Sequence, residues 1–360
     1  LDLAAGQDIE DTAGNALLPA EPASDETYTL QNDTEAPRLA SITRLTPADA
    51  VTAADTLVFQ ATFSEDVANV TADDFSATGT SAAASAVSAV SATVYDVTVS
   101  GGDLAGFDGA VGLELAAGQD IADLAGNALA DPAVTGVDES YGLDNTAPEV
   151  TLSRAGSDPV SGAFELTITF TEAVAGFELS DIAVAGGAAS DLTTDDDTVF
   201  TATITPAGDG AMSVDVAAAA ASDAAGNAST AAETLEVEAD ATPPELTVTL
   251  PAETTTGAFE ATFTFTEPVS GFELADIAVT NGAASALTTD DDTVFTATVT
   301  PQAPGTVTID VAEGAAADAA GNASTAANAS IDAVSEAAAV VLALDSATAE
   351  AGSVAANVNL

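Results

Sequence analysis

The feature of this sequence that most constrains its fold is internal repetition at a period of about 95 residues. The segment TEAVAGFELSDIAV at 171–184 recurs as TEPVSGFELADIAV at 266–279. At the same spacing, LTTDDDTVFTATITP at 192–206 recurs as LTTDDDTVFTATVTP at 287–301. Each repeat has the length of one small domain, so the chain is predicted to form a row of similar domains rather than one large core.

Motif matches divide the 360 residues into five segments. GQDIEDTAGNAL at 6–17 matches GQDIADLAGNAL at 118–129, so the sequence begins with the last third of a repeat, and it has no initial Met. We therefore expect a piece of a longer protein. The predicted segments are the C-terminal part of a truncated repeat (1–32), a longer and divergent first repeat (33–143), a second repeat (144–239), a third repeat (240–333) and the start of a further, unassigned module (334–360).

Within each repeat, apolar and polar residues alternate in short runs. Phe164, Leu166, Ile168 and Phe170 point to one side of an extended segment, while the residues between them are polar. Similar runs are separated by Gly, Pro and Asp turns, which is typical of a seven-stranded antiparallel sandwich. The predicted fold class is all-β, with tandem Ig-like β-sandwich domains arranged as beads on a string.

The charge balance excludes several classes of function. The chain has 58 Asp and Glu, three Arg, and no Lys, His or Cys, giving a net charge of −55. Such a chain cannot neutralise phosphates, so we expect no nucleic-acid partner. Thiol and imidazole chemistry lacks its residues, and we expect no enzyme. No run approaches the roughly 18 apolar residues of a membrane helix, so direct membrane insertion is not expected.

Oxygen atoms remain as ligands, and these suit hard cations, Ca²⁺ above all. In a sandwich, the point where the chain enters and three of its loops lie at one end, which we call the leading pole. There the second repeat gathers Asp144, Glu172, the 195–197 run, Asp223 and Asn227, and the third repeat gathers their equivalents. Crowded carboxylates without basic neighbours repel one another unless a cation compensates, so calcium is predicted at this pole.

Three motifs recur in order: D-x-x-x-P at the start of a repeat, [ST]-E-x-V in a loop, and D-x-A-G-N in a later turn. Together they resemble the bacterial Ig-like repeats of giant, calcium-binding surface adhesins exported by type I secretion. The resemblance covers about 1–333 and implies calcium at domain poles and junctions. Taken with the loop analysis, the candidate metal ligands are Asp11, Asn15, Asp33, Glu65, Asp123, Asn127, Asp144, Glu172, Asp195, Asp197, Asp223, Asn227, Asp240, Glu267, Asp290, Asp292, Asp318 and Asn322.

Simpler explanations exist for each acidic motif. The D-x-A-G-N turn is also favoured by its backbone geometry alone. The Asp runs at 195–197 and 290–292 also suit solvated hairpin tips, and general acidity also suits life in high salt. The first repeat has no Asp run, and its pole is expected to bind fewer ions or to use Asp73 and Asp74. Asp209 belongs to a loop at the opposite pole of its repeat, so its loss is expected to affect calcium binding little.

The expected function is a structural stalk segment of a long extracellular bacterial adhesin, made rigid by calcium at its inter-domain junctions. Its partners are then the neighbouring repeats of the same chain and an unidentified ligand of the host or surface. One alternative is a subunit of a self-assembling surface filament or sheath, with other copies as partners. Another is a set of accessory Ig-like modules of a secreted polysaccharide-active enzyme. All three place the protein outside the cell.

Overall fold

The computed structural model describes residues 8–17, 33–130, 133–251 and 254–335. This part of the chain consists of β-strands, loops and four single-turn 3₁₀ helices, which confirms the all-β fold class. No helix among these residues is long and apolar enough to cross a membrane. Most of the module predicted at 334–360 and most of the truncated repeat lie outside the described residues.

The second repeat is a sandwich of two antiparallel sheets. Its four-stranded sheet has the order β11 (Val150–Arg154), β12 (Phe164–Phe170), β15 (Val199–Pro206), β14 (Gly187–Thr194). Its three-stranded sheet has the order β13 (Ile182–Ala185), β16 (Gly210–Val216), β17 (Leu235–Ala239). Four strands against three is the layout of a seven-stranded Ig-like domain.

The other two repeats are built in the same way. The third repeat has the sheets β18 (Leu246–Thr249), β19 (Phe259–Phe265), β22 (Val294–Pro301), β21 (Gly282–Thr289) and β20 (Ile277–Thr280), β23 (Gly305–Val311), β24 (Ala327–Ala333). The first repeat has β1 (Leu39–Thr46), β3 (Thr56–Phe63), β7 (Val94–Ser100), β6 (Ala83–Ala89) facing β2 (Val51–Thr52), β10 (Tyr141–Leu143), β8 (Gly109–Leu115), β5 (Phe75–Thr78). It adds the short pair β4 (Val67–Ala68) and β9 (Ala122–Asp123).

Each repeat has its own core, formed by the inward residues of both sheets. In β12, Leu166, Ile168 and Phe170 are buried, as the alternation predicts. Phe170 also joins Phe177 and Phe200 in a cluster of edge-on rings, with centroids 5.0–5.8 Å apart. Phe177 lies in the loop between β12 and β13, so this cluster fastens a loop of the leading pole to the core.

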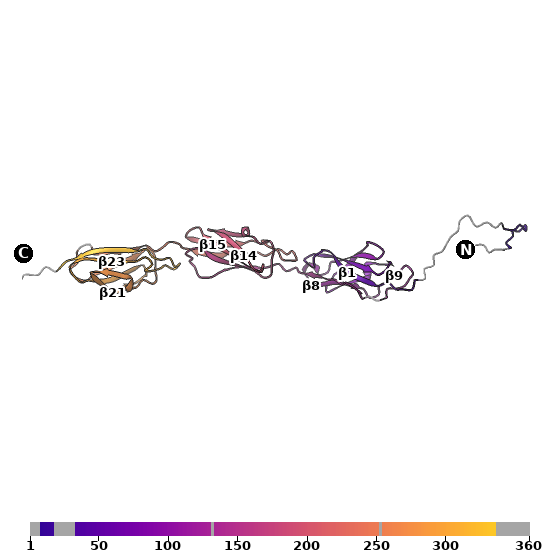
Figure 1. Cartoon of the computed structure of the whole chain (residues 1–360), viewed down its shortest axis with the longest axis horizontal. Coiled ribbons are helices and arrows are strands. Elements are labelled where there is room, and N and C mark those ends of the chain that lie inside the picture. Colours follow the sequence, from indigo (N-terminus) through magenta and orange to yellow (C-terminus); the bar gives the residue numbers. More distant parts are fainter. Residues whose placement is uncertain (1–7, 18–32, 131–132, 252–253, 336–360) are drawn as a thin grey trace, which may run out of the picture.

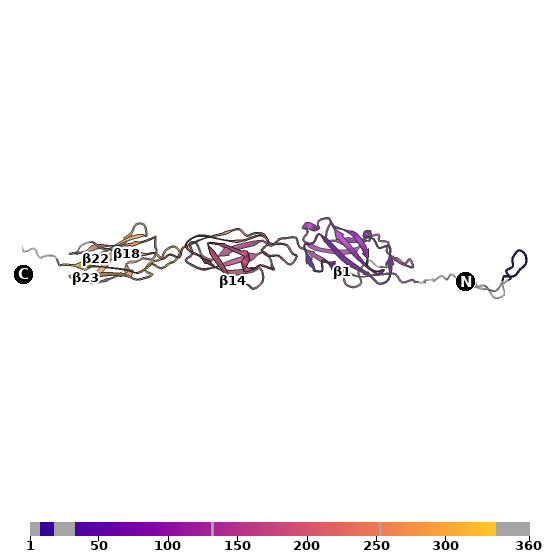
Figure 2. The same cartoon turned by 90° about the horizontal axis from the view of Figure 1, so that it is seen from above.

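The repeats follow one another along one axis, and both views of the chain show this arrangement (Figures 1 and 2). The leading pole of one repeat therefore faces the opposite end, or trailing pole, of the repeat before it. Contacts cross the first of these joints, where the Ala53 N–H donates to the Ala225 carbonyl oxygen at 3.2 Å. The loops at the poles are thus positioned to form sites between repeats.

Candidate metal sites at the leading poles

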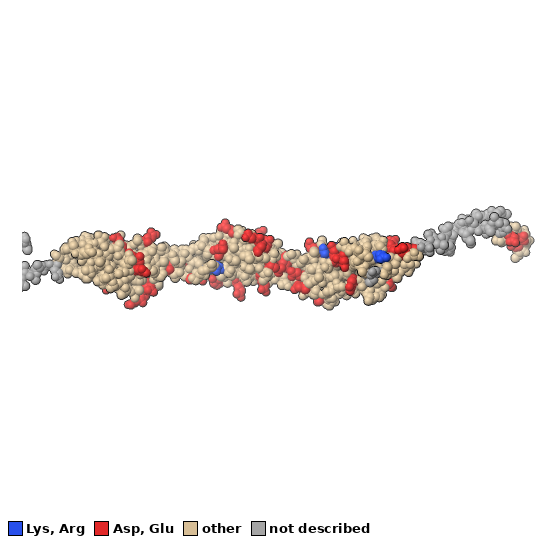
Figure 3. All heavy atoms as spheres, turned by 60° about the horizontal axis from the view of Figure 1, so that its bottom comes forward, with Lys and Arg blue, Asp and Glu red and all other residues tan. Residues whose placement is uncertain are grey.

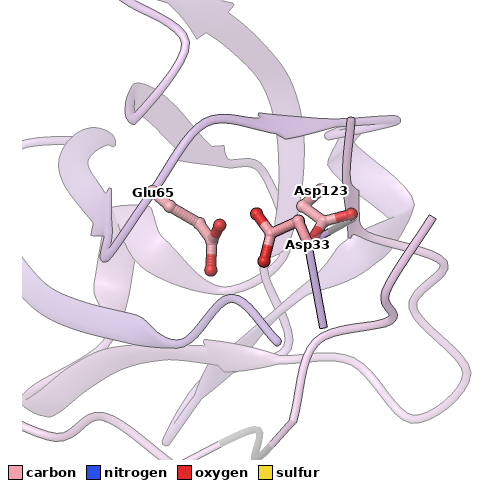
Figure 4. Close-up of side chains that lie close together, drawn as sticks. All are labelled: Asp33, Glu65 and Asp123. Atoms are coloured by element: carbon pink, nitrogen blue, oxygen red, sulfur yellow. The ribbon is translucent and has the colours of Figure 1, made fainter. Parts of the chain in front are cut away.

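Each complete repeat holds one group of three carboxylates at its leading pole. In each group, one oxygen from every residue lies within 4.8 Å of the others. We call these groups the triads, and they are Asp33–Glu65–Asp123, Asp144–Glu172–Asp223 and Asp240–Glu267–Asp318. Figure 4 shows the side chains of the first triad converging from three separate segments. All nine residues are among those predicted from the sequence.

The members of a triad come from corresponding places in each sandwich. The first is the opening Asp of the repeat, which we call the linker Asp: Asp144 directly follows β10, and Asp240 directly follows β17. The Glu comes two residues after a central strand, as Glu172 follows β12. The last Asp opens the D-x-A-G-N turn, as in Asp223. Residues distant in sequence thus meet because the sandwich brings these loops to one end.

The D-x-A-G-N turn holds its Asp in a fixed position. The Asp223 carboxylate accepts the backbone N–H of Asn227 at 2.8 Å and the Asn227 side-chain amide at 2.7 Å. Asp123 and Asp318 are held by Asn127 and Asn322 in the same way. Gly226 has φ +93°, a left-handed conformation that glycine adopts readily. The turn therefore aims a buried carboxylate, 6% exposed in each complete repeat, into the triad.

The same Asn ties the linker to the repeat that follows. Its side-chain amide also donates to the backbone carbonyl of the linker Asp, at 2.8 Å from Asn227 to Asp144 and 2.7 Å from Asn322 to Asp240. In the first repeat the bond from Asn127 to Asp33 is 3.1 Å. The predicted role of these Asn residues as metal ligands stays a prediction. Their amide nitrogens act as hydrogen-bond donors that fasten two members of each triad together.

The electrostatics of the triads favour a bound cation or proton. Partial burial, together with the charges of Asp144 and Asp223, raises the pKa of Glu172. Burial and the neighbouring carboxylates likewise raise the pKa of Glu65 and of Glu267. For Asp123, burial acts to raise the pKa, but hydrogen bonds from Asn127 outweigh it and the pKa is lowered. Each triad therefore contains a Glu that is costly to ionise, and in the first triad it stands beside Asp123, whose ionised form is favoured.

The Asp runs lie at the same pole but outside the triads. The Asp197 carbonyl accepts the N–H of Val174, which places the 195–197 loop beside the loop of Glu172. Asp196 accepts the N–H groups of Thr198 and Val199 and so caps the hairpin turn. The side chains of the four predicted ligands from these runs are exposed and belong to no carboxylate group among the described residues: Asp195, Asp197, Asp290 and Asp292. Their calcium role stays a prediction.

Two further candidates have local roles. Asp11 accepts hydrogen bonds from Ala13 and Asn15, and so forms the same turn within the described segment 8–17. Asp74, which together with Asp73 was one of two alternatives for the first repeat besides binding fewer ions, is buried and accepts the N–H groups of Thr71 and Asp120. The first triad forms without it and without any Asp run.

Two acidic residues at the joints have linker contacts that the sequence did not predict. Asp209 lies at the trailing pole of the second repeat, as expected, but this pole faces the third triad. There it accepts the Ala241 N–H at 2.6 Å, and its charge contributes to the raised pKa of Glu267. Asp108 occupies the same place in the first repeat and accepts the Asn145 N–H at 2.6 Å. The sequence signal was an Asp-Gly pair before the strand that leaves this pole, matched by D-x-T in the linker.

Basic residues do not neutralise the triads. Arg44 pairs with Glu139 at 3.5 Å, and Arg154 pairs with Asp158 four residues later. No ion pair among the described residues joins an arginine to a triad carboxylate. On the face drawn in Figure 3, acidic side chains spread over the second repeat and gather at its joint with the first. Acidity is thus both general and concentrated at the poles.

Three sandwiches in a row, each with its own core, define a protein of tandem Ig-like domains. A family model described as "Bacterial Ig-like domain" matches residues 144–239 and 240–335, more than half of the chain, and the chain belongs to this family. The family part of the sequence-based resemblance is confirmed. The finer assignment to giant adhesins exported by type I secretion stays a prediction.

Solved structures with a similar arrangement of domains include bacterial adhesins. The Escherichia coli adhesin FdeC is 16% identical, with 83% of this chain and 96% of that chain covered and a TM-score of 0.45. InvD of Yersinia pseudotuberculosis is 17% identical, with coverage of 82% and 97% and a TM-score of 0.34. These TM-scores are low, so nothing further about this chain is inferred from them. No curated protein matches the sequence.

Proposed function

We propose that this chain is a stalk segment of an extracellular bacterial adhesin, and that calcium at its leading poles makes the stalk rigid. The observation that carries the proposal is the triad, present in all three complete repeats with the linker Asp as a member. Membership of the bacterial Ig-like family supports the stalk shape, since Ig-like domains in tandem form extended rods. The proposed role is structural, with no reaction assigned to the chain.

The linker Asp couples ion binding to the joint. The Asp240 N–H donates to the Val160 carbonyl of the second repeat at 2.9 Å, while its carboxylate faces Glu267 and Asp318 of the third. Asp144 bridges the first joint in the same manner, through the Thr52 carbonyl at 3.1 Å. A cation held by the triad would therefore fix a residue whose backbone belongs to the preceding repeat.

Three carboxylates on loops suit calcium better than magnesium. Calcium accepts six to eight oxygen ligands with variable geometry, whereas magnesium retains water and requires strict octahedral geometry. The remaining ligands can come from backbone carbonyls, Asn oxygens or water. Without a cation, the three carboxylates repel one another, and screening by monovalent salt relieves this only in part.

The test is small-angle X-ray scattering of the whole chain in calcium, in magnesium and in chelator. Calcium should lengthen the maximum dimension and reduce flexibility, because it removes repulsion and ties the linker to the pole. Magnesium or added sodium chloride should do much less. Identical scattering in calcium and chelator would contradict the stalk mechanism.

Matched variants identify the residues that bind the ion. Asp318→Asn keeps the acceptor for the Asn322 backbone N–H, loses the acceptor for the Asn322 side-chain amide and removes a triad charge, so it should weaken the calcium effect at the second joint. Asp290→Asn removes a charge from the same pole outside the triad and serves as the control. If both variants respond to calcium equally, diffuse charge rather than the triad holds the ion.

A further inference from the structure

The linkers between repeats are held by a second device that needs no ion. Asp209 lies in the loop between β15 and β16, at the trailing pole of the second repeat. Its carboxylate accepts the Ala241 N–H at 2.6 Å through one oxygen and the Thr242 hydroxyl through the other. Both donors belong to the linker that opens the third repeat.

The first joint repeats this arrangement with different residues. Asp108 lies between β7 and β8, and its two oxygens accept the Asn145 N–H at 2.6 Å and the Thr146 hydroxyl at 2.9 Å. Each carboxylate thus spans two consecutive linker residues. Both hydrogen bonds stabilise the ionised form, and the pKa of each Asp is lowered accordingly.

The bonded linker residues stand directly beside the linker Asp, which is tied to the following repeat. Asp240 bonds Asn322 of the third repeat through its carbonyl, and Ala241 and Thr242 follow it immediately. Fixing Ala241 and Thr242 to the second repeat therefore restrains the third repeat relative to the second. The linker is anchored on both sides within three residues.

We propose that Asp108 and Asp209 are joint latches, which set the orientation of consecutive repeats by hydrogen-bonding the linker even when no metal is bound. This role is independent of calcium, so it goes beyond the function proposed above. The expectation that loss of Asp209 affects calcium binding little concerns a different property and stays a prediction.

The third repeat shows that the latch is not needed for the fold of a sandwich. Pro304 occupies the position of Asp209, directly before a Gly that begins the next strand in both repeats. Val334 occupies the position of Asp240, since its N–H donates to the Thr255 carbonyl at 2.8 Å as Asp240 donates to Val160. At the trailing pole of the third repeat, the latch Asp and the Asp that would open the following linker are therefore both replaced. This is expected if both residues serve a joint.

The test measures the second joint in the whole chain, in chelator. The chain has no Cys, so Glu165→Cys and Glu260→Cys place two spin labels on exposed sites in β12 and β19. Double electron–electron resonance then gives the distribution of distances between the second and third repeats. Asp209→Ala should broaden this distribution, and Thr242→Val should broaden it less.

Repulsion between the charges at the joint predicts the opposite change in the width of the distance distribution, so the experiment separates repulsion from the latch. Removing Asp209 takes one negative charge from the crowded joint, which by repulsion alone would narrow the distribution. Asp310→Ala removes an exposed Asp from β23 and should leave the distribution unchanged. The double variant Asp209→Ala, Thr242→Val should match Asp209→Ala, because the hydroxyl has then lost its partner. An unchanged or narrower distribution in Asp209→Ala would overturn the latch.

Discussion

At the scale of residues, the Glu of each triad controls how the pole responds to pH. Burial and the charges of Asp240, Asp318 and Asp209 raise the pKa of Glu267 above its ordinary value of 4.5. The folded protein therefore binds this proton more tightly than the unfolded chain does. The resulting stability is fully present below the unfolded pKa and is lost as pH rises through the folded pKa.

In chelator, the melting temperature of the chain should rise as pH is lowered from 7 toward about 4.5. The double variant Glu172→Gln, Glu267→Gln should melt higher than the unmodified chain at pH 7 and should depend less on pH. In calcium at pH 7 the unmodified chain should instead melt higher than the double variant, because the variant loses ligand charge at two triads. Thermal melts followed by circular dichroism measure each effect.

The control for this prediction is Glu260→Gln, which removes an exposed charge from β19 outside the triads. General repulsion in a chain of net charge −55 also weakens on acidification. If Glu260→Gln changes the pH dependence as much as the triad variants do, the effect belongs to the whole surface. Asp groups with a lowered pKa, such as Asp123, take up protons at lower pH and therefore do not affect the melting temperature between pH 7 and about 4.5.

At the scale of elements, the loop that carries the triad Glu depends on one aromatic anchor. Phe272 follows Glu267 in the loop between β19 and β20 and is 7% exposed. Its ring packs against Phe265 at 5.3 Å and Phe295 at 5.1 Å between centroids, one ring from each of two adjacent strands. The loop is thus anchored to the core by this ring, in addition to backbone hydrogen bonds such as that from the Val269 N–H to the Asp292 carbonyl.

Phe272→Ala should destabilise the third repeat by about 3–5 kcal/mol, the usual effect of removing a buried Phe side chain. Calcium should recover part of this loss, because an ion that binds only the folded state stabilises it. Leu274→Ala, two residues further along and 40% exposed, should cost much less. Urea unfolding in calcium and in chelator measures both variants, and equal losses would show that the aromatic cluster does not anchor the loop.

At the scale of the whole molecule, the two joints are not equivalent. The Asn145 side chain donates back to the Leu104 and Phe107 carbonyls of the first repeat, at 3.1 and 2.8 Å. The bond from Ala53 to Ala225 adds a further contact at this joint. The second joint has Ala241 where the first has Asn145, and so lacks this side-chain bonding. The first joint should therefore be stiffer than the second.

In chelator, spin labels across the first joint should give a narrower distance distribution than labels across the second. Asn145→Ala should broaden the distance distribution across the first joint toward that of the second, because it removes the side-chain hydrogen bonds to Leu104 and Phe107. Ala241→Asn provides the reciprocal test at the second joint. If the distance distribution across the first joint of the unmodified chain is as broad as that across the second, the first joint is not the stiffer one.

Much of this architecture is determined by local sequence. Alternation over seven or eight residues is enough to produce the strands, because inward apolar side chains have only the sandwich core to occupy. The hydrogen bonds of the D-x-A-G-N turn at Asp11 and Asn15 all lie within five residues, so the local sequence is enough to specify them. The Asp, Glu and Asp that the recurring motifs single out do lie together in all three triads, while their role as calcium ligands stays a prediction.

Only the tertiary structure decided which acidic residues meet. The Asp runs share a pole with the triads, yet their side chains point into solvent, and loop order alone does not give side-chain direction. The latches depend on how one repeat faces the next, so the Asp-Gly pair of one repeat and the D-x-T of the following linker show their connection only when both repeats are in place. Asp209 illustrates the difference. It is remote from Asp223 within its own sandwich, but it lies beside Glu267 because the next repeat begins where its own ends.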